Sequence, residues 1–234
     1  MDLLAGTRVV SFNHFLVGPT GAQILGDLGA DVIAVEPLGG AFQRNWSVGN
    51  RFVDGQSVNH LSTGRNKRSI ALNLKEPDAQ NIFQQLAETA DVVVEGFRPG
   101  VMDRLGAGYE KVRSINPRAI YCSVSGYGQD GPYSQLAGHD IDYISFAGAL
   151  GLIGPYDGKP SIPLNLIADY AGGGLCGAVG ILAALTAREK TGAGQYVDIA
   201  MSEGVLHMLS GLICDVLPRG ISAERGENRL NGGL

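Results

Sequence analysis

Cysteine is scarce in this chain, and positive charge is not in excess. The three cysteines, Cys122, Cys176 and Cys214, are odd in number and widely spaced, a pattern that fits neither a disulfide framework nor a zinc site. We therefore predict no metal centre and a reducing, cytoplasmic location. The 18 lysines and arginines are outnumbered by 23 aspartates and glutamates, which argues against a general binder of nucleic acid or of anionic membranes.

The sequence also shows no cleavage pattern after its short N-terminal apolar stretch, so we predict a first strand there and no export. The one long uncharged segment, residues 170–187, contains 18 residues and reaches the lower limit for a membrane span. Five of those residues are glycines. We interpret the segment as a closely packed core helix, with a membrane span as the alternative.

Short β-branched runs alternate with helical patterns over the first half of the chain. The predicted strands are residues 8–12, 31–36, 69–74, 91–97 and 119–124. The predicted helices between them are residues 20–28, 77–90 and 109–115. This alternation indicates βαβ units, and hence an α/β fold with a mostly parallel sheet and helices on both faces.

The pattern changes after residue 130. A loop-rich stretch leads to a long helix predicted over residues 169–190, then to a short strand or helix start at 196–200 and a helical pattern over 203–216. The polar tail, residues 218–234, ends in Asn231-Gly232-Gly233-Leu234, which is a turn pattern. Because a domain does not normally finish on an open turn, we expect sequence beyond this point.

The first strand is followed by a glycine turn that invites comparison with dinucleotide-binding proteins. Such a site requires G-x-G-x-x-G, whereas here Gly18 and Gly21 flank Pro19. The spacing therefore disfavours a nicotinamide site, and a structural strand-to-helix turn is the simpler explanation.

Two basic clusters are candidates for phosphate binding. Arg65, Lys67 and Arg68 precede one predicted strand, and Lys75 follows it. The sequence Glu95-Gly96-Phe97-Arg98-Pro99-Gly100 follows another strand, with Arg104 close behind. Ligands of open α/β sheets bind outside the carboxyl ends of strands, and arginine matches phosphate geometry. Solvated loops are the alternative for each cluster alone; together the clusters favour a nucleotide-bearing ligand.

His139 and Asp169 are the candidate catalytic residues. Structural roles are available for both, because an aspartate at a helix start is a preferred N-cap and a histidine beside Asp140 suits a cap or a core hydrogen bond. Capping does not explain the run Gly172-Gly173-Gly174, which is costly inside a helix. We interpret the run as a place of close backbone approach, where helix amides stabilise a developing oxyanion.

Taken together, these motifs resemble the family III CoA-transferases, a family that includes the alpha-methylacyl-CoA racemases. The resemblance covers nearly the whole chain and lies in Gly18-Pro19 with residues 28–32, in residues 66–69, 95–100 and 126–133, in Asp169 with its glycines, and in residues 192–198. It implies a Rossmann-like large domain over residues 1–217, the start of a linker over 218–234, a smaller second domain encoded by later sequence, and an interlocked homodimer.

The resemblance also implies which residues contact the substrate. CoA, as part of the substrate and not as a tightly bound cofactor, is expected against six residues: Leu72, Lys75, Gly96, Phe97, Arg98 and Arg104. Asp140, Asn165, Gly172 and Gly173 are expected to support the catalytic pair.

Two chemistries compete within the resemblance. A racemase uses His139 and Asp169 as two bases on opposite faces of the α-carbon of a 2-methylacyl-CoA. A CoA-transferase uses an aspartate matching Asp169 as the nucleophile, through an anhydride and an aspartyl-CoA thioester. We favour the racemase, because only that mechanism has a use for the histidine. A truncated, inactive CoA-binding fragment is the second alternative.

One position departs from the family pattern. Many relatives place a basic residue directly after the acidic end of the second strand, whereas here Pro37 follows Glu36. This change puts one adenine-side contact in doubt.

Overall fold

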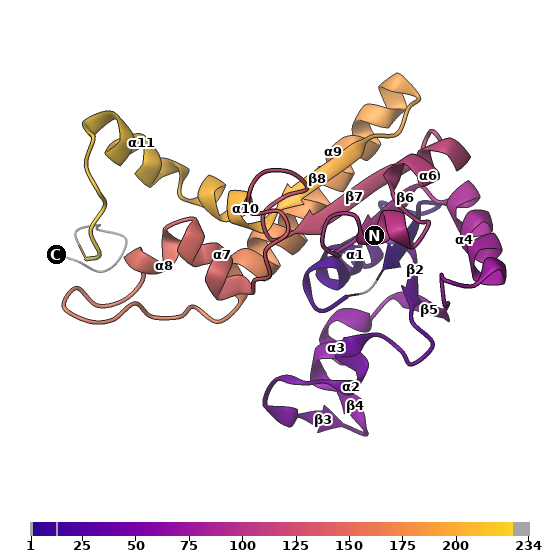
Figure 1. Cartoon of the computed structure of the whole chain (residues 1–234), viewed down its shortest axis with the longest axis horizontal. Helices are drawn as coiled ribbons and strands as arrows, with labels where there is room; N and C mark the ends of the chain where they lie inside the picture. Colours follow the sequence, from indigo (N-terminus) through magenta and orange to yellow (C-terminus); the bar gives the residue numbers. More distant parts are fainter. Residues whose placement is uncertain (1, 13, 227–234) are drawn as a thin grey trace.

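The computed structural model describes residues 2–12 and 14–226, built around a six-stranded parallel sheet (Figure 1). The strand order is β5-β2-β1-β6-β7-β8, and every neighbouring pair is parallel. This is the doubly wound strand order: from β1 the chain adds strands toward one edge of the sheet, and from β6 it adds them toward the other. The predicted α/β class and parallel sheet are confirmed.

The strands are β1 (Arg8–Phe12), β2 (Asp31–Glu36), β3 (Phe52–Val53), β4 (Gln56–Ser57), β5 (Lys67–Ala71), β6 (Val92–Glu95), β7 (Ile120–Ser125) and β8 (Tyr196–Ala200). The helices are α1 (Val17–Asp27), α2 (Phe42–Asn45), the 3₁₀ turn η1 (Val48–Asn50), α3 (Val58–Gly64), α4 (Pro77–Thr89), α5 (Val101–Arg104), α6 (Tyr109–Ile115), α7 (Asp140–Phe146), α8 (Ala149–Leu152), the π-helix η2 (Leu166–Leu175), α9 (Cys176–Thr191), α10 (Met201–Met208) and α11 (Ser210–Arg219).

Predicted and observed elements agree most closely near the chain start. The bounds of β1, β2 and α6 match the prediction. Strand β5 lies two residues earlier than predicted, because Lys67 pairs in register with Val32 at the start of β2. The pairing ends with β2, where the Leu72 amide donates to the Glu36 carbonyl at 2.8 Å.

Each face of the sheet buries its own apolar cluster. Val9, Val94 and Val124 point to the face covered by α1, α9 and η2, where Ile181 of α9 is fully buried. Val10, Val93 and Tyr121 point to the other face, where they pack with Phe83 of α4. Strands buried on both faces are expected to be continuously apolar, as β6 and β7 largely are.

Helices η2 and α9 form one continuous helical segment, Leu166–Thr191, which is long and apolar enough to cross a membrane by length and composition. Buried core helices pass the same test, and this segment packs against α1, α10 and β7. The arrangement agrees with the interpretation as a packed helix. The helix begins at Leu166, three residues earlier than predicted.

The glycines of η2 are in contact with neighbouring helices of the protein. A Cβ at Gly173 would lie 2.4 Å from Val17 Cγ1 of α1, and one at Gly172 would lie 2.8 Å from the Met201 carbonyl oxygen. From the other side, a Cβ at Gly204 would lie 2.5 Å from the Gly172 oxygen. What approaches this backbone is therefore α1 and α10, which gives the glycine run a packing role, and a contribution of Gly172 and Gly173 to the chemistry remains a prediction.

A small lobe, which the sequence patterns did not reveal, leaves the sheet after β2 (Figure 1). It contains α2, η1, the β3–β4 hairpin and α3. Arg44 ties it to the sheet, because its guanidinium donates through Nε and Nη2 to the buried Glu36 carboxylate. That carboxylate also accepts from the Ala41 amide and the Ser69 hydroxyl.

The basic cluster before β5 has protein partners of its own. Arg65 pairs with Asp27, Arg68 pairs with Asp31, and the Lys67 ammonium donates to the Pro19 carbonyl. The two arginines lie at the amino end of β5, away from the edge where ligands bind. The predicted phosphate site is wrong for these three cations.

At the C-terminal side, α11 extends away from the sheet (Figure 1). The predicted boundary after residue 217 falls inside the last turn of α11, and residues 227–234 of the predicted linker lie outside the described residues. After α11 the chain contacts α8 and the loop that follows it through Arg225. The Arg225 guanidinium donates to the carbonyls of Gly151, Pro155 and Gly158. The second domain and the linker remain predictions.

The close contact between η2 and α10 predicts how much stability is lost when a methyl group is added at Gly204. We expect Gly204→Ala to lower the free energy of unfolding by about 1–3 kcal/mol, because the added carbon meets rigid backbone at Gly172. The matched control is Gly211→Ala in α11, where a Cβ would meet nothing within 4 Å; it should be neutral or stabilise by up to about 1 kcal/mol. Urea unfolding measures both, and equal effects would contradict the close contact.

Candidate active site

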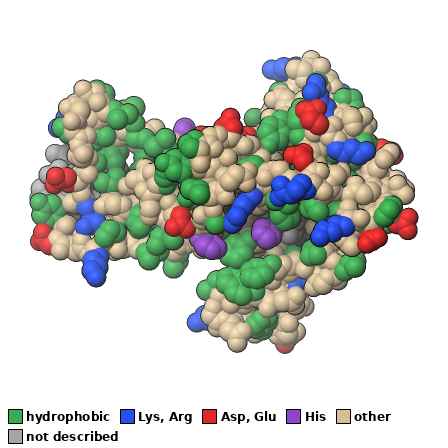
Figure 2. All heavy atoms as spheres, viewed as in Figure 1, with side chains coloured by type: hydrophobic (Ala, Val, Ile, Leu, Met, Phe, Trp, Pro, Cys, Tyr) green, Lys and Arg blue, Asp and Glu red, His purple; other side chains and the backbone are tan. Residues whose placement is uncertain are grey.

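A cavity of about 550 Å³ opens at the carboxyl edge of the sheet, near the reversal point between β1 and β6. Histidine and basic side chains gather along the hollow between the main body and the small lobe (Figure 2). The cavity is lined by His14, Phe15, Val17, Gly96, Phe97, Arg98, Pro99, Val101, Val124, Ser125, Gly126, Ser134, Leu136, Ala137, Gly138, His139, Asp142, Tyr143, Asp169 and Met201. Both predicted catalytic residues are among them.

Asp140 joins the two segments that carry these residues. Its Oδ2 accepts hydrogen bonds from the backbone amides of Ala168 at 2.7 Å and Asp169 at 2.8 Å. The carboxylate is buried. A helix start leaves its first amides without internal partners, and here the partner comes from another helix 28 residues away. Asp140 therefore fixes the start of η2 next to the start of α7.

Asp169 lies in the first turn of η2 and is not its N-cap, which is Asn165. The pKa of the Asp169 carboxyl is raised to about 6: burial is the main cause and the neighbouring Asp140 adds to it, while a hydrogen bond from Asn165 Nδ2 and the nearby His139 act in the opposite direction. The Asn165 bond measures 3.1 Å to Oδ2. Asp169 is thus oriented by Asn165 and tuned toward neutral pH.

The amides that we expected to stabilise an oxyanion are already occupied. Those of Ala168 and Asp169 both donate to Asp140, so they are not free for a substrate oxygen. That expectation is wrong for these two groups.

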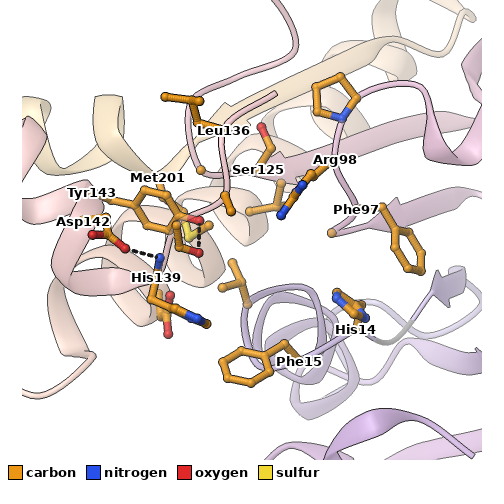
Figure 3. Close-up of a pocket in the computed structure, with 18 of the residues that line it drawn as sticks. His14, Phe15, Phe97, Arg98, Ser125, Leu136, His139, Asp142, Tyr143 and Met201 are labelled. Atoms are coloured by element: carbon orange, nitrogen blue, oxygen red, sulfur yellow. Dashed lines mark hydrogen bonds between the residues drawn. The ribbon is translucent and has the colours of Figure 1, made fainter. Parts of the chain in front are cut away.

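His139 is the N-cap residue of α7. Its backbone amide donates to Asp142 Oδ2 at 2.9 Å, which is the capping arrangement expected as the structural alternative. Its side chain is nevertheless exposed and lines the cavity, with the imidazole directed toward Phe15 (Figure 3). The Phe15 ring lies 5.9 Å from the imidazole, centroid to centroid. His139 thus takes part in the cap of α7 and also presents its ring to the cavity.

The predicted CoA contacts divide into two groups. Gly96, Phe97 and Arg98 line the cavity together with the catalytic pair. Lys75 and Arg104 are exposed and Leu72 is buried in the second core cluster, and these three lie outside the cavity lining. Their contact with CoA remains a prediction.

Several lining residues escaped the sequence patterns, although a signal for them existed. His14 and Phe15 follow β1, and the His14 ring stacks on Phe97 with centroids 5.0 Å apart. Ser125 ends β7 and Met201 follows β8. The rule that ligands bind at the carboxyl ends of strands covers the positions of all four residues.

Phe15 also connects the cavity to the small lobe. Its ring lies 5.4 Å from that of Trp46 and 5.9 Å from that of Phe42, both in the lobe. Phe15 adopts a φ of 55°, which is rare for a non-glycine residue. The aromatic rings of the lobe therefore pack against Phe15, and Phe15 is the ring that lies next to His139.

The arrangement suits proton transfer or nucleophilic attack at a carbonyl compound. It offers an imidazole, a carboxyl group with a pKa of about 6 and a guanidinium at the carboxyl edge of the sheet. Among the described residues, no group of three or more His, Cys, Asp or Glu side chains is placed to hold a metal ion.

Comparison with known proteins agrees with this geometry. The sequence model for CoA-transferase family III matches residues 4–233. The human alpha-methylacyl-CoA racemase is 40% identical over 98% of this chain and 56% of its own length. The mouse succinyl-CoA:glutarate CoA-transferase is 42% identical over 85% of this chain and 45% of its own. The chain thus spans about half the length of these relatives.

A solved structure supports the same assignment. The crystal structure of a CAIB/BAIF family protein from Brucella suis superposes with a TM-score of 0.88 at 36% identity, covering 95% of this chain and 59% of the other. The match of family model, sequence and fold over nearly the whole chain shows that it belongs to CoA-transferase family III.

Proposed function

We propose that this protein acts on acyl-CoA thioesters and racemises or epimerises 2-methylacyl-CoA by α-proton transfer between His139 and Asp169. The observation that carries the proposal is that both side chains line one cavity while Asp140 fixes the backbone segments that present them. Sequence identity to racemases and to transferases is similar, near 40%, and does not separate the two reactions. The presence of His139 favours racemisation, because only that mechanism uses a histidine.

In the two-base reaction one residue removes the α-proton and the other delivers a proton to the opposite face. When ionised Asp169 takes the proton, protonated His139 supplies the other, and the thioester enolate is the intermediate. The reverse direction uses neutral His139 and protonated Asp169. A carboxyl group with a pKa of about 6 is suited to both states near neutral pH.

CoA would lie along the loop after β6, with Arg98 near its phosphates. The thioester would then face the catalytic pair, which shares the cavity with this loop. A cytoplasmic location and a homodimer are part of the proposal.

CoA transfer is the alternative function. Asn165 Nδ2 holds Asp169 Oδ2 at 3.1 Å, which fixes one oxygen and leaves Oδ1 to attack a thioester carbonyl. Attack would form a mixed anhydride with Asp169 and release CoA thiolate, and the thiolate would then attack the aspartyl carbonyl, expel the donor carboxylate and leave an aspartyl-CoA thioester for the acceptor carboxylate. This route requires Asp169 and makes no use of His139.

Replacing the histidine separates the two functions. We expect His139→Ala to reduce exchange of the α-proton with heavy water by at least about a hundredfold, measured on the 2-methylacyl-CoA epimer whose α-proton His139 removes, because the base for that epimer is lost. CoA transfer to an added carboxylate should be spared where it occurs. The control is His207→Ala, which changes an exposed histidine of α10 outside the cavity. Wild-type exchange in His139→Ala would contradict the racemase.

The pH dependence tests the role of Asp169. For the epimer whose proton Asp169 removes, the residue must be ionised, so kcat/KM should fall as pH drops below about 6. Asn165→Ala removes a hydrogen bond that favours the ionised form, and this acidic limb should move to higher pH.

The control for that profile is Asn81→Ala on the exposed side of α4. It should leave the acidic limb of the kcat/KM profile at the wild-type pH. If that limb also stays in place in Asn165→Ala, Asp169 is not the group that titrates.

A further inference from the structure

A row of polar side chains crosses three strands beneath the cavity. Glu95 of β6 pairs in register with Ser123 of β7, and Ser123 with Asp198 of β8. In-register residues of parallel strands point to the same face. Glu95 is 4% exposed and Ser123 is 1% exposed, so a carboxyl group and a hydroxyl are buried side by side.

Glu95 holds the loop that carries Phe97 and Arg98. Its Oε2 accepts the Phe97 backbone amide at 2.7 Å, and Ser123 forms a second hydrogen bond to the carboxyl group. Ser123 in turn accepts from the Tyr196 hydroxyl at 3.0 Å. The three strands thus share one hydrogen-bonded chain that ends at a loop lining the cavity.

Asp198 holds the second loop in the same way. Its Oδ2 accepts the Gln129 backbone amide at 3.0 Å. Gln129 lies in the connection between β7 and α7, which lines the cavity and leads to His139. The two ends of the row therefore anchor the two loops between which a CoA thioester would lie.

Within the described residues, no cation appears among the groups that shift the pKa of Glu95. The charged groups that act on it are Asp103 of α5 and Asp198 of β8, and both are acidic. The titratable groups around it on the strands are Tyr121, Cys122 and Tyr196, with Tyr109 of α6 packed on the two tyrosines. The pKa of Glu95 is raised to about 7, mainly by burial and in part by the two acids, against the lowering effect of its two hydrogen bonds.

We propose that Glu95 and Asp198 are positioning residues for the CoA-binding loops, and that Glu95 takes up a proton when the ligand binds. This inference rests on the proposed function, because the ligand is taken to be a polyanionic CoA compound. Glu95 is a buried carboxylate without a cation beside it in the described part of the chain, and it holds the loop that the ligand contacts. A negatively charged ligand on this loop favours the protonated form of Glu95. The affinity for the CoA ligand should therefore fall as pH rises, because binding takes up a proton and the proton concentration in solution decreases.

The test is calorimetric titration of the whole chain with CoA between pH 6 and 8, in buffers of different ionisation enthalpy. We expect the wild-type affinity to fall about three- to tenfold over this range, within the limit of tenfold per pH unit for one linked proton. Proton uptake should accompany binding. Glu95→Gln keeps an acceptor for the Phe97 amide, so it should bind CoA with a flatter pH profile and less proton uptake.

The comparison between variants removes contributions from the phosphates of CoA and from His14 and His139, which both proteins share. Glu189→Gln, at an exposed acid of α9, is the matched control and should keep the wild-type profile. Asp198→Asn should weaken binding with a smaller change in proton uptake, because the Asp198 side chain is exposed and acts through the Gln129 amide.

The outcomes separate this inference from the function on which it rests. If Glu95→Gln keeps the wild-type slope and proton uptake, the inference is overturned while CoA binding stands. The same holds if Glu95→Gln loses affinity equally at every pH, which is what a purely structural role predicts. If the folded wild-type chain binds no CoA at any pH, the proposed function is contradicted and the inference falls with it.

Discussion

The cavity depends on the buried carboxylate of Asp140, a residue of α7 that accepts hydrogen bonds from the start of another helix, η2. Asp140 accepts the amides of Ala168 and Asp169, which the start of η2 leaves unpaired. A negative charge is also favoured there by the helix dipole. Because Asp140 directly follows His139, the same bond that completes η2 places the histidine beside the aspartate. The same hydrogen bonds thus organise the helix start and bring the two candidate residues into one cavity.

Close helix packing supplies the rest of the framework. The glycines of η2 let α1 and α10 approach its backbone to distances that no side chain would permit. Gly173 meets Val17 of α1, and Val17 itself lines the cavity. The glycine run thus belongs to the core, and its effect on the site is indirect, through the position of the helix that carries Asp169.

The sequence predicted those parts of the fold that local patterns encode. The bounds of β1 and β2 follow from β-branched runs, and the motif around Phe97 was correctly placed at the carboxyl end of β6. Partners far apart in the chain were not predictable, because no local pattern marks them. Arg65 was expected to bind phosphate and instead pairs with Asp27, 38 residues away. The catalytic candidates came from a family resemblance, whereas the contacts that position them required the structure.

Fixing the pair through Asp140 has a consequence for how such a site changes over time. Of the described residues between α8 and η2, only Asn165 at the end of the connection contacts Asp169 through a side-chain hydrogen bond, and part of the preceding loop is held separately by Arg225. We therefore expect the length and composition of that loop to have little effect on the geometry of His139 and Asp169. An engineer who wished to alter the acyl group that the protein accepts would find in residues 156–164 a segment to rebuild while the two candidate residues stay in place.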